Sequence, residues 1–160
     1  EYQGQIPNDI HVLNWILNGG APTMAAYNKV DKQEQRFIME SLQKIPFSFT
    51  NFKVNDRKFY LCHSAPGKAK RKDILYREDV MDPLHFVWDR MDPSQPFLRN
   101  KTIIAGHTIV LNYHKELRVY ADTLDLQTAH YIDIDCGCAM HDENSKLACL
   151  CLDTMEVSYY

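Results

Sequence analysis

The chain has 160 residues, of which 45% are hydrophobic and 24% charged, and its formal net charge is −3. A domain of this length and composition can bury a substantial core. The slight acidity argues against nucleic acid as a partner, because nucleic-acid-binding proteins usually present a basic face. No apolar run approaches the roughly 20 residues of a membrane span, and no secretory pattern opens the sequence. We therefore expect a cytoplasmic protein without nucleic-acid or membrane partners.

The first part of the chain, residues 1–46, is predicted to be mainly helical. Apolar residues recur there with helical spacing, and Gly19 marks the end of the first helix. Pro22 suits the first turn of a second helix. Asp31 is the predicted cap of a third helix, with a glutamate three residues later completing a capping box.

The second part, residues 47–160, is predicted to form a sheet. Two β-rich runs, FSFTNFKV and RKFYLCH, are separated by Asn55-Asp56, which is a strong hairpin signal. Trp15 and Trp88 are expected to anchor the core. We expect one nearly complete sheet built from residues 47–63, 102–105, 131–135 and 146–160.

The cysteines do not resemble a secreted disulfide framework, because their number is odd and four of them form two CxC pairs. Reduced thiols in a cytoplasmic protein fit this pattern better. The two pairs could form a four-thiolate zinc site, but thiols that pack within strands are the favoured interpretation. The residues concerned are Cys62, Cys136, Cys138, Cys149 and Cys151.

Two histidines share one local setting. His63 follows the strand RKFYLC and precedes small residues, and His107 follows TIIAG and precedes Thr108. The C-terminal ends of buried strands are where α/β folds bind ligands, and neutral imidazole is the commonest nitrogen ligand of catalytic metals. For either histidine alone, a satisfied loop or core residue would be the favoured interpretation. Their common setting favours metal ligands.

Five sequence blocks occur in an order that resembles the phosphoprotein phosphatases of the calcineurin-like metallophosphoesterase superfamily, above all their bacterial and phage branch. That branch has an "HWLLNGG" segment, a strand ending in histidine, a tryptophan stretch ending in arginine, a "GHT" after an apolar strand and a "YIDTG" strand. The corresponding blocks are NWILNGG (14–20), YLCHS (60–64), FVWDR (86–90), IIAGHT (103–108) and YIDIDCG (131–137).

The resemblance implies a fold and a set of roles. The fold would be α/β, a four-layer α/β sandwich of the metallo-dependent phosphatase type, of which this chain supplies the second half. His63 and His107 would be metal ligands, and Arg90 and Asn18 would bind the substrate phosphate. The cofactors would be two divalent metal ions, with manganese favoured and iron or zinc as alternatives. The substrate would be a serine/threonine phosphoprotein or a small phosphoester.

The sequence departs from the family pattern in one large respect. The motifs GDxHG, GDxxDRG and GNHE, which supply the other metal ligands and the general-acid histidine, do not occur in these residues. We therefore expect the motif-bearing N-terminal half to be missing, with the chain starting near the end of GNHE, and the chain alone to be inactive. Two alternatives stay open: a diadenosine polyphosphate hydrolase of the same superfamily, and a non-catalytic scaffold or binding domain that retains the fold.

Overall fold

The computed structural model describes residues 10–64, 83–94, 98 and 100–160. The chain divides into two compact units, Glu1–Ile45 and Pro46–Tyr160. None of the described helices is long and apolar enough to cross a membrane.

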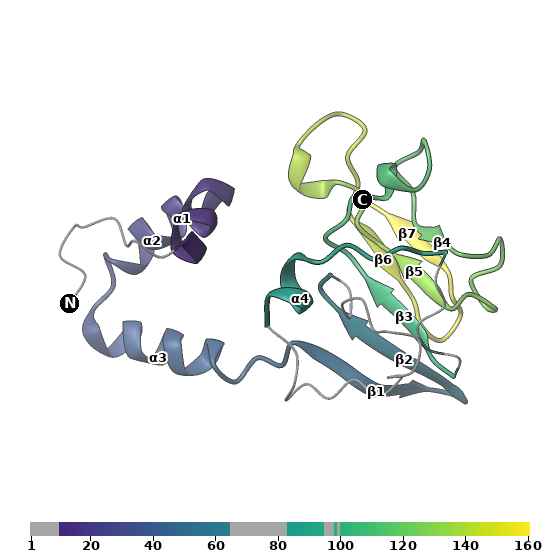
Figure 1. Ribbon diagram of the computed structural model, residues 1–160, viewed down its shortest axis with the longest axis horizontal. Coiled ribbons are helices and arrows are strands. Elements are labelled where there is room, and N and C mark those ends of the chain that lie inside the picture. Colours follow the sequence, from purple (N-terminus) through teal and green to yellow (C-terminus); the bar gives the residue numbers. More distant parts are fainter. Residues whose placement is uncertain (1–9, 65–82, 95–97, 99) are drawn as a thin grey trace. The chain divides into compact units, whose positions relative to one another are not determined.

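The first unit is helical, as predicted (Figure 1). Gly19, at a φ of +94°, breaks the helical path between the first two helices. The carboxylate of Asp31 caps the third helix by accepting hydrogen bonds from the amides of Gln33 and Glu34, at 2.8 and 2.9 Å. The helices are α1 (Ile10–Trp15), α2 (Ala21–Tyr27) and α3 (Lys32–Leu42), with a π-type turn, Ile16–Gly20, between α1 and α2.

Trp15 is not the core anchor that the sequence suggested, because 43% of it is exposed. Its ring lies instead against Gly20, where an added Cβ would come within 2.5 Å of the indole. Its contact with Gly20 therefore supports the turn between α1 and α2.

The second unit contains a five-stranded mixed sheet in the order β1-β2-β3-β5-β4 (Figure 1). The three central strands, β2, β3 and β5, run parallel, and the two edge strands pair antiparallel. Asn55, at a φ of 52°, forms the predicted hairpin turn. The strands are β1 (Ser48–Val54), β2 (Arg57–Cys62), β3 (Thr102–Ala105), β4 (Tyr120–Ala121) and β5 (Tyr131–Asp133).

The prediction that residues 146–160 belong to this sheet is wrong. The last two strands, β6 (Ala148–Leu150) and β7 (Val157–Tyr159), form a separate two-stranded sheet. Leu150, Leu152 and Val157 pack against the core on one face of the main sheet, so the hairpin covers a face and does not extend an edge. The edge belongs to β4, whose two residues are too few to show a strand pattern in the sequence.

The sheet carries apolar side chains on both faces, because successive residues of a strand point to opposite sides. The cluster beneath the β6–β7 hairpin contains Phe59, Ile104 and Ile132, and the opposite cluster contains Tyr60, Ile103 and Tyr131. Helix α4 (Pro83–Trp88) precedes β3 in the chain. Trp88 is 42% exposed, so its predicted role as a core anchor is also wrong.

The five cysteines are free thiols. Cys136 is buried and Cys62 is half-buried, in agreement with packing. The interpretation of all five as packed thiols is wrong, because Cys138, Cys149 and Cys151 are exposed. These three lie in the turn after β5 and in or just after the short strand β6, where only one side of the chain meets the core.

Asp133 is a fully buried carboxyl group in β5. Burial raises its pKa to about 7, although hydrogen bonds from the amide of Asp135 and the hydroxyl of Tyr131 act in the opposite direction. The folded protein therefore holds this proton more tightly than the unfolded chain does. The resulting stabilisation is complete below the unfolded pKa near 4 and is lost as pH rises through about 7.

We expect this carboxyl group to make the free energy of unfolding depend on pH. The loss between pH 5 and pH 8 should be of the order of 2–4 kcal/mol. Urea unfolding at both pH values, followed by near-ultraviolet circular dichroism, measures it. Asp133→Asn, which cannot ionise, should flatten this dependence, and an equally steep dependence in the variant would contradict the assignment to Asp133.

Candidate metal site

The two histidines singled out in the sequence lie at one edge of the sheet. His63 directly follows β2, and His107 follows β3 after a single glycine. Because β2 and β3 are parallel neighbours, the loops that begin at their ends emerge together. The amide of Gly106 donates a hydrogen bond of 2.9 Å to the carbonyl of His63, which links the two loops directly.

The imidazole rings of His63 and His107 face each other across a short gap. Their centroids are 4.9 Å apart and their planes are inclined by 56°. Two imidazoles that bind one metal ion at about 2.0–2.1 Å place their ring centroids roughly 5 Å apart. The structure thus brings the two residues together at a spacing that suits a shared ion, and the metal assignment itself stays a prediction.

His107 presents a buried lone pair. Its Nε2 atom is buried and has no hydrogen-bond partner among the described residues. The ring also forms a hydrogen bond to the backbone of Trp88. This bond raises the pKa of the imidazole, so the ring nitrogen is the donor and the Trp88 carbonyl is the acceptor. With that N–H donated, the opposite nitrogen carries the lone pair. A backbone carbonyl fixes the tautomer of metal-binding histidines in the same way.

The electrostatic surroundings of His107 lower the pKa of its imidazole and so favour the neutral form. Burial lowers the pKa of its imidazole most, and the nearby charges of His63 and Arg90 lower it further. The hydrogen bond to Trp88 and the carboxylate of Asp135 act in the opposite direction, but the net direction is downward. Neutral imidazole is the form that binds a metal, so this environment suits a ligand.

The backbone of His107 is in the left-handed region, at a φ of 64°. Such a conformation costs a non-glycine residue on the order of 1–3 kcal/mol and tends to occur at functional sites. Neighbouring hydrogen bonds hold the turn: the amide of Val110 donates to the carbonyl of Asp135 at 3.0 Å. The Asp135 carboxylate in turn accepts from the amide of Gly137, also at 3.0 Å. Residues 135–137 therefore support the turn at His107.

The two residues predicted to bind phosphate lie in different units. Arg90 is exposed, lies two residues after α4 and is close enough for its charge to act on His107. Asn18 belongs to the first unit, where its side-chain amide donates to the carbonyl of Asn14 at 2.8 Å. A phosphate-binding role stays a prediction for both.

The metal site is incomplete within the described part of the chain, where no group of three or more His, Cys, Asp or Glu side chains is placed to hold an ion. A mainly apolar cavity of about 410 Å³ opens beside His63. It is lined by Leu61, Cys62, His63, Ile104, Ala105, Gly106, Ile134, Leu150 and Leu152. Burial raises the pKa of the Cys62 thiol to about 12, so this thiol stays protonated.

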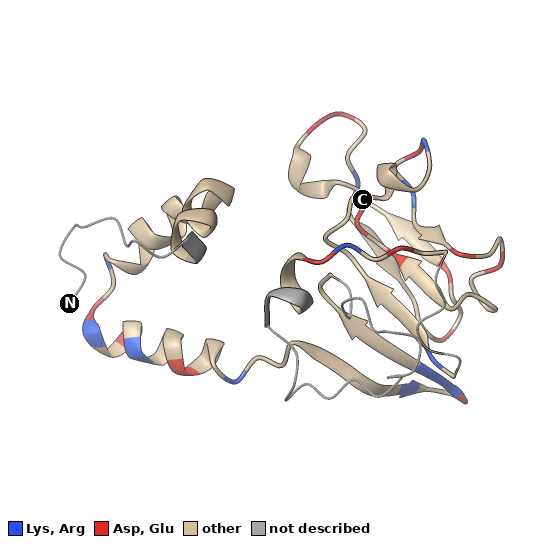
Figure 2. Ribbon diagram, viewed as in Figure 1, with Lys and Arg blue, Asp and Glu red and all other residues tan. Residues whose placement is uncertain are grey.

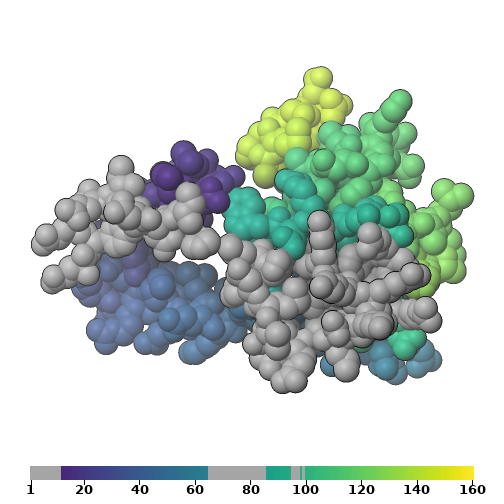
Figure 3. All heavy atoms as spheres, viewed as in Figure 1, coloured from purple at the N-terminus to yellow at the C-terminus, as the bar shows by residue number. Residues whose placement is uncertain are grey.

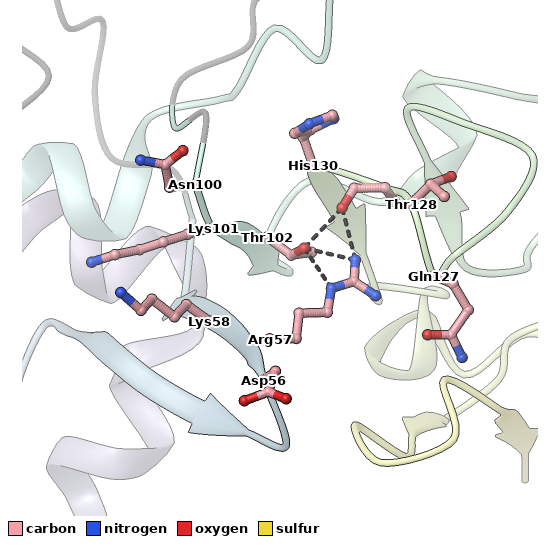
Figure 4. A pocket seen from close by; sticks show the side chains of 10 residues that line it. Asp56, Arg57, Lys58, Asn100, Lys101, Thr102, Gln127, Thr128 and His130 are labelled. Carbon is pink, nitrogen blue, oxygen red and sulfur yellow. Dashed lines mark hydrogen bonds between the residues drawn. The ribbon is translucent and has the colours of Figure 1, made fainter.

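A second cavity, of about 440 Å³, lies at the opposite end of the parallel strands (Figure 4). Basic residues gather near the β1–β2 turn (Figure 2). The guanidinium of Arg57 is directed toward Thr102 and away from Lys58 and Lys101 (Figure 4). It donates to the Thr102 hydroxyl at 2.7 and 2.9 Å and to the carbonyls of Leu126 and Ala129 at 2.9 and 2.8 Å. Arg57 therefore joins β2, β3 and the loop before β5, and its donors are largely occupied by protein acceptors.

We expect Arg57→Ala to lower the free energy of unfolding by about 2–4 kcal/mol, because it leaves buried acceptors without their charged donor. Urea unfolding at constant pH measures the change. Lys58→Ala is the matched control, since this neighbouring side chain is exposed and its loss should change stability by less than about 0.5 kcal/mol. Equal effects of the two substitutions would contradict the linking role of Arg57.

Sequence reasoning missed two features of the site. The carbonyl of Trp88 that orients His107 lies in the FVWDR block, yet a backbone contact leaves no mark in the residue types. The left-handed turn at His107 was also missed, although the glycine before it and the small threonine after it indicated a tight loop.

Comparison of the chain with protein-family models, with curated proteins and with solved structures finds no match. A relationship to the metallophosphoesterases is therefore a proposal that depends on the five sequence blocks and on the geometry of the two histidines.

Proposed function

We propose that this chain is the second half of a metal-dependent phosphomonoester hydrolase with a four-layer α/β sandwich fold, acting on serine/threonine phosphoproteins or small phosphoesters. One observation carries the proposal: the rings of His63 and His107 lie 4.9 Å apart at the ends of two parallel strands. The buried, unpartnered Nε2 atom of His107 supports it, and so does the nearby charge of Arg90.

Each residue has a distinct role in this proposal. His63 and His107 hold one of two divalent metal ions, and the Trp88 carbonyl keeps the His107 ring oriented. The metal pair supplies an activated water and neutralises charge on the phosphate. Arg90 holds the phosphate oxygens through its planar guanidinium, which is suited to bidentate contacts. Imidazole ligands are compatible with manganese, iron or zinc.

Two histidines and one arginine do not suffice for this reaction. The proposal therefore requires a bridging carboxylate, further metal ligands and a leaving-group acid from outside these 160 residues. We propose that the family motifs GDxHG, GDxxDRG and GNHE supply them.

The test is a comparison of this chain with the longest open reading frame that contains it. With manganese, the longer protein should hydrolyse an aryl phosphate, and the 160-residue chain should not. His63→Ala and His107→Ala in the longer protein should abolish turnover. A phosphoserine peptide and diadenosine tetraphosphate, assayed side by side, separate the two hydrolase classes. Turnover that survives both substitutions would falsify the proposal.

A further inference from the structure

The hydroxyl of Tyr113 lies where three segments around the candidate site meet. Tyr113 is half-buried and directly follows the short turn Val110–Asn112. Its hydroxyl donates to the carbonyl of Met91 at 3.3 Å and lies 3.4 Å from the hydroxyl of Tyr131. A side-chain hydrogen bond also connects it to Thr108.

Two of these partners are the chain neighbours of candidate site residues. Met91 follows Arg90, and Thr108 follows His107. The two segments lie side by side in the space-filling view, where α4 and the residues after it adjoin those after β3 (Figure 3). The positive charge of Arg90 acts to lower the pKa of both His107 and Tyr113.

The third partner anchors this junction in the sheet. Tyr131 is buried in β5 and donates its hydroxyl proton to the carboxyl group of Asp133 at 2.8 Å. Its ring packs edge-on against that of Tyr113, with centroids 6.2 Å apart. The hydroxyl of Tyr131 donates its only hydrogen to Asp133. The hydroxyl of Tyr113 can therefore donate its own hydrogen to the Met91 carbonyl.

We propose that Tyr113 is a positioning residue whose hydroxyl holds the Arg90 segment against the His107 turn, so that the guanidinium and the imidazole face the same phosphate. This inference rests on the proposed function, in which Arg90 binds the phosphate. The aromatic ring of Tyr113 stabilises the core by packing, whereas the hydroxyl alone sets the position of Arg90.

The substitution that isolates the hydroxyl is Tyr113→Phe, which keeps the ring. Tyr120→Phe is the matched control, because the Tyr120 ring packs against that of Tyr113, with centroids 4.7 Å apart and planes inclined by 33°, so the substitution removes a neighbouring hydroxyl and keeps the ring contact. Both variants should keep the melting temperature within a few degrees of the parent chain.

The first readout is backbone order in the 160-residue chain, measured by ¹⁵N NMR relaxation. In Tyr113→Phe the order parameters of the Arg90 and Met91 amides should fall from about 0.85 toward 0.6, while Tyr120→Phe leaves them unchanged. Unchanged order in Tyr113→Phe would overturn the inference.

The second readout is the affinity of the cobalt-loaded longer protein, which carries the additional metal ligands, for inorganic phosphate, measured by calorimetry. Tyr113→Phe should weaken phosphate binding by about 3- to 10-fold. In an Arg90→Ala background the same change should have no further effect, because Tyr113 acts through Arg90. Equal losses in both backgrounds would overturn the inference. An NMR response in the chain without phosphate binding by the longer protein would support the positioning role and contradict the proposed function.

Discussion

Under the proposed function, replacing His107 with alanine in the longer protein is expected to abolish binding of one of the two divalent metal ions. In the proposal, His107, whose Nε2 atom is buried without a hydrogen-bond partner among the described residues, and His63, whose ring centroid lies 4.9 Å from that of His107, share that ion. Loss of an outer partner of a metal ligand costs 10- to 100-fold in metal affinity, and loss of the ligand itself should cost at least as much. Cobalt titration followed by visible absorption measures the affinity.

The matched control is His130→Ala, which removes an exposed histidine at the other end of the sheet. It should leave the cobalt spectrum unchanged, whereas His63→Ala should repeat the effect of His107→Ala. Affinity should also fall as pH drops, because protons compete with metal ions for ligand nitrogens. Equal cobalt binding by all three variants would show that the ion binds elsewhere.

In the complete enzyme that the proposal requires, Arg90→Lys is expected to lower kcat/KM for an aryl phosphate by about 10²–10³. Lysine keeps the positive charge but lacks the planar fork that contacts two phosphate oxygens at once. Metal affinity should hardly change, because Arg90 is not a ligand and acts on His107 only through its charge. Steady-state kinetics and cobalt titration on the same preparations separate the two properties.

Arg118→Lys is the control for a general loss of guanidinium. Arg118 is exposed and forms a surface ion pair with Glu116 at 2.7 Å, so its replacement should not affect turnover. If Arg90→Lys left kcat/KM unchanged as well, Arg90 would not contact the phosphate, and its nearness to His107 would have no catalytic meaning.

Local signals predicted much of the fold. Asp31 caps α3 as its spacing to Glu34 indicated, and Asn55 turns the β1–β2 hairpin as its place between two β-rich runs indicated. The strand before His107 was evident from its short apolar run. These features depend on residues within a few positions of one another, which is the range over which sequence patterns are informative.

Features that depend on distant residues were not predictable in the same way. The role of β4 as an edge strand and the separate β6–β7 hairpin follow from packing across the sheet, not from local pattern. Trp88 is 42% exposed although tryptophan is usually buried, and its ring lies nearly perpendicular to that of His107, with centroids 5.7 Å apart. The histidine pair itself was predicted from two similar strand ends, since parallel strands finish at a common edge.

Hydrogen bonds from Arg57 connect the parallel strands β2 and β3 at their N-terminal ends, and His63 and His107 lie just after their C-terminal ends. Arg57 ties the beginnings of β2 and β3 to the loop before β5, far along the strands from the two imidazoles. In the proposed enzyme, substitutions near the histidines would alter specificity and leave the Arg57 hydrogen bonds in place, whereas substitutions near Arg57 would change thermal stability and leave the histidine site unchanged. A directed-evolution library should accordingly confine its diversity to the loops that follow β2 and β3.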